Sequence, residues 1–323
     1  MERFVNVNRE EQYLSKQNTT PLATGEIIEE SKNPKEPAQN KDFVYLNGEI
    51  IPAEFALLPV ADKGLLFGYG LFETFLVKNG QAVFIEEHLA RLRLSAPKIS
   101  LVMPEEEQYP LSLHEGIHEV IAKNNMSEGS LRLTVTAGTE DSGRSNVVIT
   151  AKKGLAYRPE HYSQGFRAGF LKNPRNESSP LVYVKSLNYL ENILGRRETT
   201  AKGWNEGLFL NTKGFLVEGT VSNVFLVTKD KELVTPDISS GLLPGVMRAK
   251  VLKTASTAGY RCIERAVLPE ELFTAKECFL TNSLMVVMPL VEVEGKIIGD
   301  GGIGEVTIEI GVGMGKFIRI PSG

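Results

Sequence analysis

Two Asn-Gly turns do more than any other feature to restrict the folds open to this chain. The first, at 47–48, divides the apolar segment 43–51, and the second, at 79–80, divides the segment 71–84. Two-residue hairpin turns favour Asn-Gly because both positions take a positive φ. The chain is therefore predicted to start as antiparallel sheet.

Helical and strand patterns extend this sheet into a small α/β domain. Residues 85–96 and 111–124 have the spacing of helices, and residues 131–137 and 146–151 have the pattern of strands. The predicted domain spans residues 42–156.

A second, larger domain is predicted for residues 157–323. Residues 1–41 precede both domains; they are polar, have few apolar anchors and are predicted to form a disordered or loosely docked extension, with an arm that clasps a dimer as the alternative. The elements predicted in the second domain are hairpins at 207–217, 221–234 and 288–298, a helix that opens at 243–248 after a proline and ends near 259, helices at 269–275 and within 303–318, and a strand at 277–281.

Composition excludes several classes of protein. The 323 residues carry a net charge of -4, so no basic face for nucleic acid or acidic membrane is indicated. Two cysteines make no disulfide framework, and neither a secretory signal nor an uncharged run of membrane-spanning length is apparent. A soluble cytoplasmic protein is expected.

One lysine, Lys185, is predicted to lie between an apolar strand, residues 180–184, and an amphipathic helix that buries Leu187, Leu190 and Leu194. A lysine held in a water-poor scaffold loses its charge more readily, and the neutral amine can form a Schiff base with a carbonyl. Taken alone, a solvated surface lysine is the commoner outcome.

A second motif, residues 114–118, matches the zinc-peptidase pattern H-E-x-x-H. His114 and His118 would share one helix face, with Glu115 as the base. However, the helix has its own apolar stripe, and no further motif plainly supplies a third ligand. An amphipathic helix with exposed histidines is favoured, and zinc peptidase stays a remote alternative.

A glycine-rich segment, residues 62–70, is neither a Walker loop nor a dinucleotide fingerprint, because its spacing differs and the next predicted element is a strand. It indicates a tight turn that leads into a buried strand. Residues 72–74, in that strand, are candidates to face a pocket.

Three further groups complete what a pyridoxal phosphate site requires. Arg91, on a predicted helix, suits bidentate phosphate binding. The helix start at 244–247 offers free backbone N–H groups to the same phosphate. Glu218, at the end of a strand, is placed to meet a ring nitrogen, and Lys185 supplies the amine. Spacing alone does not show that these groups converge.

The chain resembles the class IV, fold type IV family of pyridoxal phosphate enzymes over about residues 43–310. This family includes branched-chain aminotransferases, D-amino acid aminotransferases and aminodeoxychorismate lyases. The resemblance implies an α/β fold of the D-amino acid aminotransferase type, with a small N-terminal domain and a larger C-terminal pseudo-barrel. Six blocks carry it in order, at 62–74, 88–92, 185–190, 218–225, 243–248 and 281–285.

The resemblance also implies roles for individual residues. Lys185 binds the cofactor and moves protons, and Glu218 keeps the ring nitrogen protonated. Leu243 packs under the ring, and Tyr189 reaches the phenolic oxygen. The phosphate ligands are expected to be Arg91, the backbone of Val246 and Met247, and Ser283.

Within the family, the sequence favours aminodeoxychorismate lyase, a folate-pathway enzyme that releases pyruvate to give p-aminobenzoate. The block at 282–289 resembles the lyases, and Thr74 replaces the glycine of the branched-chain signature F-E-G. Thr74 is a candidate for proton movement and Arg144 for a substrate carboxylate. An aminotransferase acting on D- or branched-chain amino acids is the alternative. A homodimer with a small-molecule substrate and no metal is expected.

Overall fold

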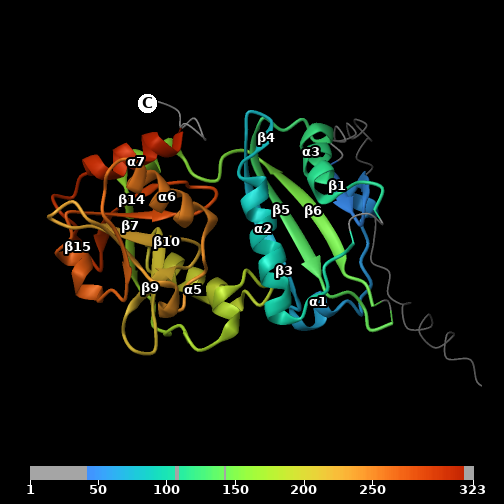
Figure 1. Cartoon of the computed structure of the whole chain (residues 1–323), viewed down its shortest axis with the longest axis horizontal. Coiled ribbons are helices and arrows are strands. Elements are labelled where there is room, and N and C mark those ends of the chain that lie inside the picture. The colour runs from blue at the N-terminus through green and yellow to red at the C-terminus, as the bar shows by residue number, and fades with distance from the viewer. Residues whose placement is uncertain (1–41, 106–108, 142, 316–323) are drawn as a thin grey trace, which may run out of the picture. The chain divides into compact units, whose positions relative to one another are not determined.

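The computed structural model describes residues 42–105, 109–141 and 143–315 (Figure 1). The predicted extension, residues 1–41, lies outside the described residues. The described residues belong to one compact unit. In the described ranges this unit contains two sheets, one on each side of residue 156, and the domain boundary at that residue stays a prediction.

The first sheet is antiparallel throughout, with the order β2-β1-β6-β5-β3-β4. Both predicted Asn-Gly hairpins are confirmed: φ is 49° and 98° at Asn47 and Gly48, and 52° and 73° at Asn79 and Gly80. The strands are β1 (Phe43–Leu46), β2 (Glu49–Pro52), β3 (Gly70–Lys78), β4 (Gln81–Ala82), β5 (Glu128–Thr136) and β6 (Asn146–Lys153).

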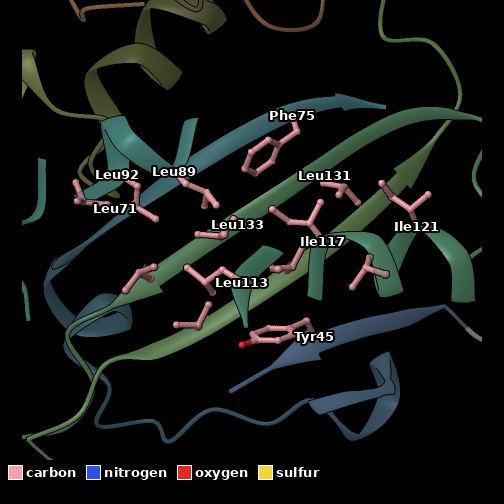
Figure 2. Close-up of a cluster of buried hydrophobic side chains, with 14 of the residues drawn as sticks. Tyr45, Leu71, Phe75, Leu89, Leu92, Leu113, Ile117, Ile121, Leu131 and Leu133 are labelled. Atoms are coloured by element: carbon pink, nitrogen blue, oxygen red, sulfur yellow. The ribbon is translucent and has the colours of Figure 1, made fainter. Parts of the chain in front are cut away.

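Two helices, α2 (Ile85–Ser95) and α3 (Leu113–Lys123), pack on this sheet and enclose a core with it (Figure 2). Gly116 allows α3 to approach Tyr45 of β1 closely, because a Cβ at position 116 would lie 2.4 Å from the Tyr45 ring. The Tyr45 hydroxyl donates to the carbonyl of Leu111 at 2.9 Å. The glycine of the H-E-x-x-H match therefore has a packing role.

The second sheet is mixed, with the order β12-β11-β10-β13-β14-β7-β8-β9 and β15 paired to β14. The helices of this half of the chain are α4 (Pro159–Gln164), α5 (Leu190–Ala201), α6 (Val246–Thr257) and α7 (Glu305–Gly315). The strands are β7 (Phe166–Phe170), β8 (Glu206–Leu210), β9 (Leu216–Gly219), β10 (Asn223–Val227), β11 (Leu233–Pro236), β12 (Cys262–Arg265), β13 (Glu277–Thr281), β14 (Met288–Val293) and β15 (Lys296–Ile297).

The surroundings of the predicted strand–lysine–helix unit differ from the expectation. Pro180–Tyr183 is a short 3₁₀ helix rather than a strand, because Pro180 starts a turn that Ser179 caps through the N–H of Leu181. The following helix begins only at Leu190, and Leu190 and Leu194 are 65% and 48% exposed instead of buried.

Two smaller differences concern other elements. The helix predicted at 269–275 is a 3₁₀ helix, Pro269–Phe273. The glycine-rich segment contains one short helix, α1 (Lys63–Phe67), which Asp62 caps through the N–H of Gly64 before β3 begins.

Among the described residues, no helix is long and apolar enough to cross a membrane.

Candidate active site

A cavity of about 560 Å³ brings the predicted site residues together. Arg144 is exposed and is not among the lining residues. The predicted residues that do line the cavity are Thr74, Arg91, Lys185, Tyr189, Glu218, Leu243, Val246, Met247 and Ser283.

Lys185 is held by the first sheet, although it comes from the second half of the chain. The N–H of Phe72 donates to the carbonyl of Lys185, and the N–H of Leu187 donates to that of Gly70, both at 2.9 Å. The Lys185 amine lies 4.3 Å from the centre of the Phe72 ring and has no hydrogen bond or ion pair to another described residue. Burial, aided by the charge of Arg91, lowers the pKa of Lys185 to about 8.

Glu218 is the last residue but one of β9 and is almost completely buried. Its Oε2 accepts hydrogen bonds from the N–H of Leu243 at 3.0 Å and from Asn223 Nδ2 at 3.2 Å, and its Oε1 lies 3.4 Å from Arg175 Nη1. Burial raises the pKa of Glu218 to about 7, and the guanidinium of Arg175 opposes this rise. The carboxyl is therefore poised to share a proton near neutral pH.

Helix α6 presents an open N-terminus to the cavity. It begins at Val246 after Gly245, and no side chain caps it, so its first N–H groups lack a partner within the helix. Gly245 is needed there because a Cβ would lie 2.1 Å from Asn223 Oδ1. Arg91 donates from Nη1 to the carbonyl of Pro244 at 3.2 Å, which places its charge beside this helix start. Such an arrangement favours a bound phosphate.

The structure adds residues that the sequence analysis did not single out. Arg132, on β5, lines the cavity with its guanidinium carbon 3.7 Å from the centre of the Phe72 ring. Arg175 is buried beside Glu218. Glu73 does not line the cavity but binds Arg91: its Oε1 accepts from Nε at 2.8 Å and its Oε2 accepts from Nη2 at 2.6 Å. Residues 72–74 were the right segment to suspect, because Phe72 and Thr74 line the cavity.

The zinc-peptidase match receives no support from its surroundings. His114 and His118 are exposed on α3, as the amphipathic-helix interpretation predicts. Glu115 accepts a hydrogen bond from the N–H of Ser112 at 2.9 Å and completes a capping box. Within the described ranges, no group of three or more His, Cys, Asp and Glu side chains is placed to hold a metal.

The lining residues fit pyridoxal phosphate. A partly buried amine with a lowered pKa and no hydrogen-bond partner among the described residues suits its aldehyde, and a buried carboxyl beside the Arg175 guanidinium suits its ring nitrogen. The cation beside an open helix N-terminus suits its phosphate. Three types of group that the cofactor requires thus face one cavity.

Comparison with known proteins agrees with this chemistry. The family model "Amino-transferase class IV" matches residues 70–293. A putative branched-chain-amino-acid aminotransferase of Methanocaldococcus jannaschii is 31% identical over 274 residues, which cover 82% of this chain and 92% of that protein. An aminodeoxychorismate lyase of Bacillus subtilis is 30% identical over 262 residues, which cover 78% and 87%.

Solved structures confirm the predicted fold. A hypothetical aminotransferase of Mycobacterium tuberculosis, solved in a PLP-bound form, has a TM-score of 0.77 at 23% identity and covers 86% of this chain and 99% of its own. The predicted fold type IV architecture is therefore right. The chain belongs to the class IV aminotransferases, a family of pyridoxal phosphate-dependent enzymes.

Proposed function

We propose that this enzyme is a 4-amino-4-deoxychorismate lyase, which releases pyruvate and forms p-aminobenzoate for folate biosynthesis. The observation that carries the proposal is the placement of the Thr74 side chain in the same cavity as the Lys185 amine. The elimination requires a base at the carbon that bears the amino group, and a proton for the departing enolpyruvate. The two side chains are suited to these two tasks.

Several residues would hold the cofactor. Arg91, Ser283 and the N–H groups of Val246 and Met247 would bind its phosphate, and Leu243 would pack under its ring. Tyr189, whose hydroxyl donates to the carbonyl of Thr220 at 3.4 Å, would reach the phenolic oxygen. When bound, pyridoxal phosphate withdraws electrons from the carbon that carries the substrate amino group.

Lys185 and Glu218 would control the protons. The neutral Lys185 amine accepts the proton from C4 of the substrate, because burial disfavours its charged form. The Glu218 carboxylate holds a proton at the ring nitrogen, and the Arg175 guanidinium favours this charged form by opposing the rise in pKa that burial causes. The bond between C3 and the enolpyruvate oxygen then breaks, the ring becomes aromatic, and enolpyruvate takes up a proton to become pyruvate. No amino acceptor is consumed.

Arg132 supports an anionic substrate. Its guanidinium lines the cavity on β5, and β3 places Thr74 directly opposite it in the sheet register. A guanidinium binds a carboxylate through two parallel N–H donors. We infer that Arg132 binds a substrate carboxylate in the same cavity in which Lys185 and Thr74 act. The role predicted for Arg144 stays a prediction.

The second candidate is an aminotransferase for D- or branched-chain amino acids. It is favoured by the similarity to the Methanocaldococcus jannaschii protein. Lys185 would then remove a proton from the amino acid and return it to another carbon on the same side, and a keto acid would be obligatory. Arg132 would bind the amino acid carboxylate in this reaction too.

The deciding experiment supplies the purified enzyme with aminodeoxychorismate alone, without any keto acid. The lyase predicts equal amounts of pyruvate and p-aminobenzoate over many turnovers. An aminotransferase predicts neither product. Instead, its cofactor absorbance near 400 nm should fall on addition of a D- or L-amino acid and return on addition of a keto acid. Absence of both products, at saturating cofactor, would overturn the lyase proposal.

We also propose a homodimer in the cytoplasm. Apolar side chains are exposed on α1, at Leu65 and Phe67, and on α5, at Leu190 and Leu194. The end of α1 lies close to the segment that precedes α5, because Asn188 donates from Nδ2 to the carbonyl of Gly68 at 2.9 Å, and Asn188 lines the cavity. An apolar patch of this kind marks an interface.

Sedimentation velocity tests the homodimer. The wild-type chain should sediment as a dimer, and Leu194→Asp should shift it toward the monomer. Val312→Asp, which changes an exposed apolar side chain on α7, is the matched control and should remain dimeric. A wild-type monomer at micromolar concentration would contradict the proposal.

A further inference from the structure

Two of the proposed phosphate ligands come from elements that belong to different sheets' layers, a helix and a turn, and are joined by a buried pair of side chains. Arg91 lies on α2 over the first sheet, and Ser283 lies in the turn between β13 and β14 of the second. Glu73 and His88, each about 1% exposed, connect them. Neither residue lines the cavity, and the proposed reaction uses neither.

Glu73 fixes the plane of the Arg91 guanidinium. Its Oε1 accepts from Arg91 Nε at 2.8 Å and its Oε2 accepts from Arg91 Nη2 at 2.6 Å, so the two groups meet fork to fork. Burial alone would raise the pKa of Glu73, but Arg91 and His88 outweigh burial and lower it to about 2. The carboxylate therefore stays charged, and the fork leaves the Nη1 side of Arg91, which also donates to the carbonyl of Pro244 at 3.2 Å, as the side that a ligand can reach.

His88 connects the Glu73 carboxylate to Ser283. The His88 Nδ1 lies 2.7 Å from Glu73 Oε2, and its Nε2 lies 3.3 Å from Ser283 Oγ. Because a carboxylate only accepts, Nδ1–H must be the donor to Glu73. Burial lowers the pKa of His88, which favours the neutral ring; this ring has an acceptor at Nε2, which orients the Ser283 hydroxyl.

We infer that Glu73 and His88 are positioning residues for the cofactor phosphate. Glu73 orients Arg91 directly and, through His88, orients Ser283, so that ligands from a helix and a turn form one preorganised anion site. This inference rests on the proposed use of pyridoxal phosphate. It goes further by assigning phosphate selectivity to a buried pair that does not touch the cofactor.

If Glu73 and His88 act in this way, they affect how tightly the phosphate group of the cofactor is bound. Pyridoxal has the same aldehyde and ring as pyridoxal phosphate but lacks the phosphate. A variant that misplaces Arg91 and Ser283 should therefore lose affinity for pyridoxal phosphate and keep its affinity for pyridoxal. A variant that merely loosens the fold should weaken both.

The experiment measures the dissociation constants of both compounds by absorbance, using the full-length chain freed of cofactor. Glu73→Gln keeps the shape of the side chain and removes its charge, and His88→Gln removes the imidazole. Each should raise the constant for pyridoxal phosphate roughly 10- to 100-fold, which corresponds to one charged hydrogen bond, and change that for pyridoxal less than about threefold. Asn124→Ala is the control, because Asn124 is also buried and hydrogen bonded but does not line the cavity.

A double-mutant cycle keeps the inference testable if Glu73→Gln does not fold. Ser283→Ala should weaken pyridoxal phosphate binding in the wild-type chain and have little further effect in His88→Gln, because the two residues act as one unit. Equal losses for both compounds, or additive effects of Ser283→Ala and His88→Gln, would overturn the inference and leave the proposed function standing. A wild-type chain that binds pyridoxal phosphate no better than pyridoxal would overturn both.

Discussion

Arg175 and Glu218 face each other inside the protein, with 3.4 Å between Nη1 of the arginine and Oε1 of the glutamate. Both side chains are buried, and Arg175 Nη2 has no hydrogen-bond partner among the described residues. The guanidinium also lies over the ring of Phe209, 4.0 Å from its centre. A cation kept in this place by packing limits how far burial raises the pKa of Glu218, and so affects the proton that Glu218 is proposed to hold.

Replacing Arg175 with glutamine should raise the pKa of Glu218 further above about 7, because the charge that opposes burial is removed. Glu218 would then be neutral at pH 7 and would hold the ring-nitrogen proton poorly. We expect kcat at pH 7 to fall roughly tenfold for each unit of pKa change and to recover as the pH rises. A pH–rate profile measures this effect.

Arg175→Lys is the matched control for that experiment, since it keeps the positive charge and should retain a profile close to that of the wild type. A parallel loss of activity at every pH in Arg175→Gln would contradict the electrostatic explanation, because such a loss indicates a change of structure alone.

The rate at which the cofactor-free chain captures pyridoxal phosphate should depend on the pKa of Lys185. Burial lowers this pKa to about 8, and only the neutral amine attacks the aldehyde. The rate should therefore rise about tenfold per pH unit up to pH 8 and level off above it, whereas an ordinary lysine would continue to gain up to about pH 10.4. Stopped-flow absorbance measures the rate.

Two variants identify the amine. Lys185→Met should capture no cofactor at any pH, and Lys202→Met, which replaces an exposed lysine, should match the wild type. A capture rate that keeps rising beyond pH 10 would show that the reacting amine is solvated.

The residues around Lys185 show how much of this site can be predicted from the local sequence pattern. A lysine that follows apolar residues and precedes a helix is a candidate for a packed setting, but the local pattern alone favours a solvated surface lysine, and only the resemblance to the family reverses that expectation. The spacing of Leu187, Leu190 and Leu194 was wrongly taken as a face buried within the chain, because a hydrophobic pattern does not say which surface covers it. The exposed leucines are explained if a second copy of the chain packs on them.

Other parts of the site depend on contacts between residues distant in sequence. Arg91 could be suspected from its helix, but Glu73 could not be assigned to it without knowing that α2 packs on β3. His88 and Arg91 are three positions apart and therefore share a helix face. This spacing is the feature of the sequence that indicates that the two side chains lie near each other. The sequence pattern does not indicate that Arg132 belongs to the site, since an arginine in an alternating strand is normally solvated.

Arg132 and Arg144 provide a direct test of which arginine binds the substrate carboxylate. Arg132 lines the cavity and Arg144 does not. Arg132→Gln should lower kcat/KM roughly 10- to 100-fold, mainly through a higher KM, because one charged hydrogen-bonding group is lost. Arg144→Gln should change kcat/KM less than about threefold. The reverse order of effects, in steady-state assays, would restore the role predicted for Arg144.

Substitution of Thr74 distinguishes the two candidate reactions, elimination and amino-group transfer. A hydroxyl in the cavity serves elimination, because the departing enolpyruvate needs a proton, whereas an amino-group transfer returns its proton through Lys185. Thr74→Val keeps the shape of the side chain and removes the hydroxyl, and Thr74→Ser keeps the hydroxyl. If the enzyme is a lyase, Thr74→Val should lower kcat for pyruvate release about 10²-fold, and Thr74→Ser should retain most of it.

The cofactor spectrum is the internal control for Thr74, since neither variant should alter binding at Lys185 and Arg91. Loss of pyruvate release with an unchanged spectrum would assign the hydroxyl to the chemical step. Equal activity of the valine and serine variants would remove the observation on which the lyase proposal rests. The aminotransferase would then become the better explanation of a cavity that both the Lys185 amine and Arg132 line.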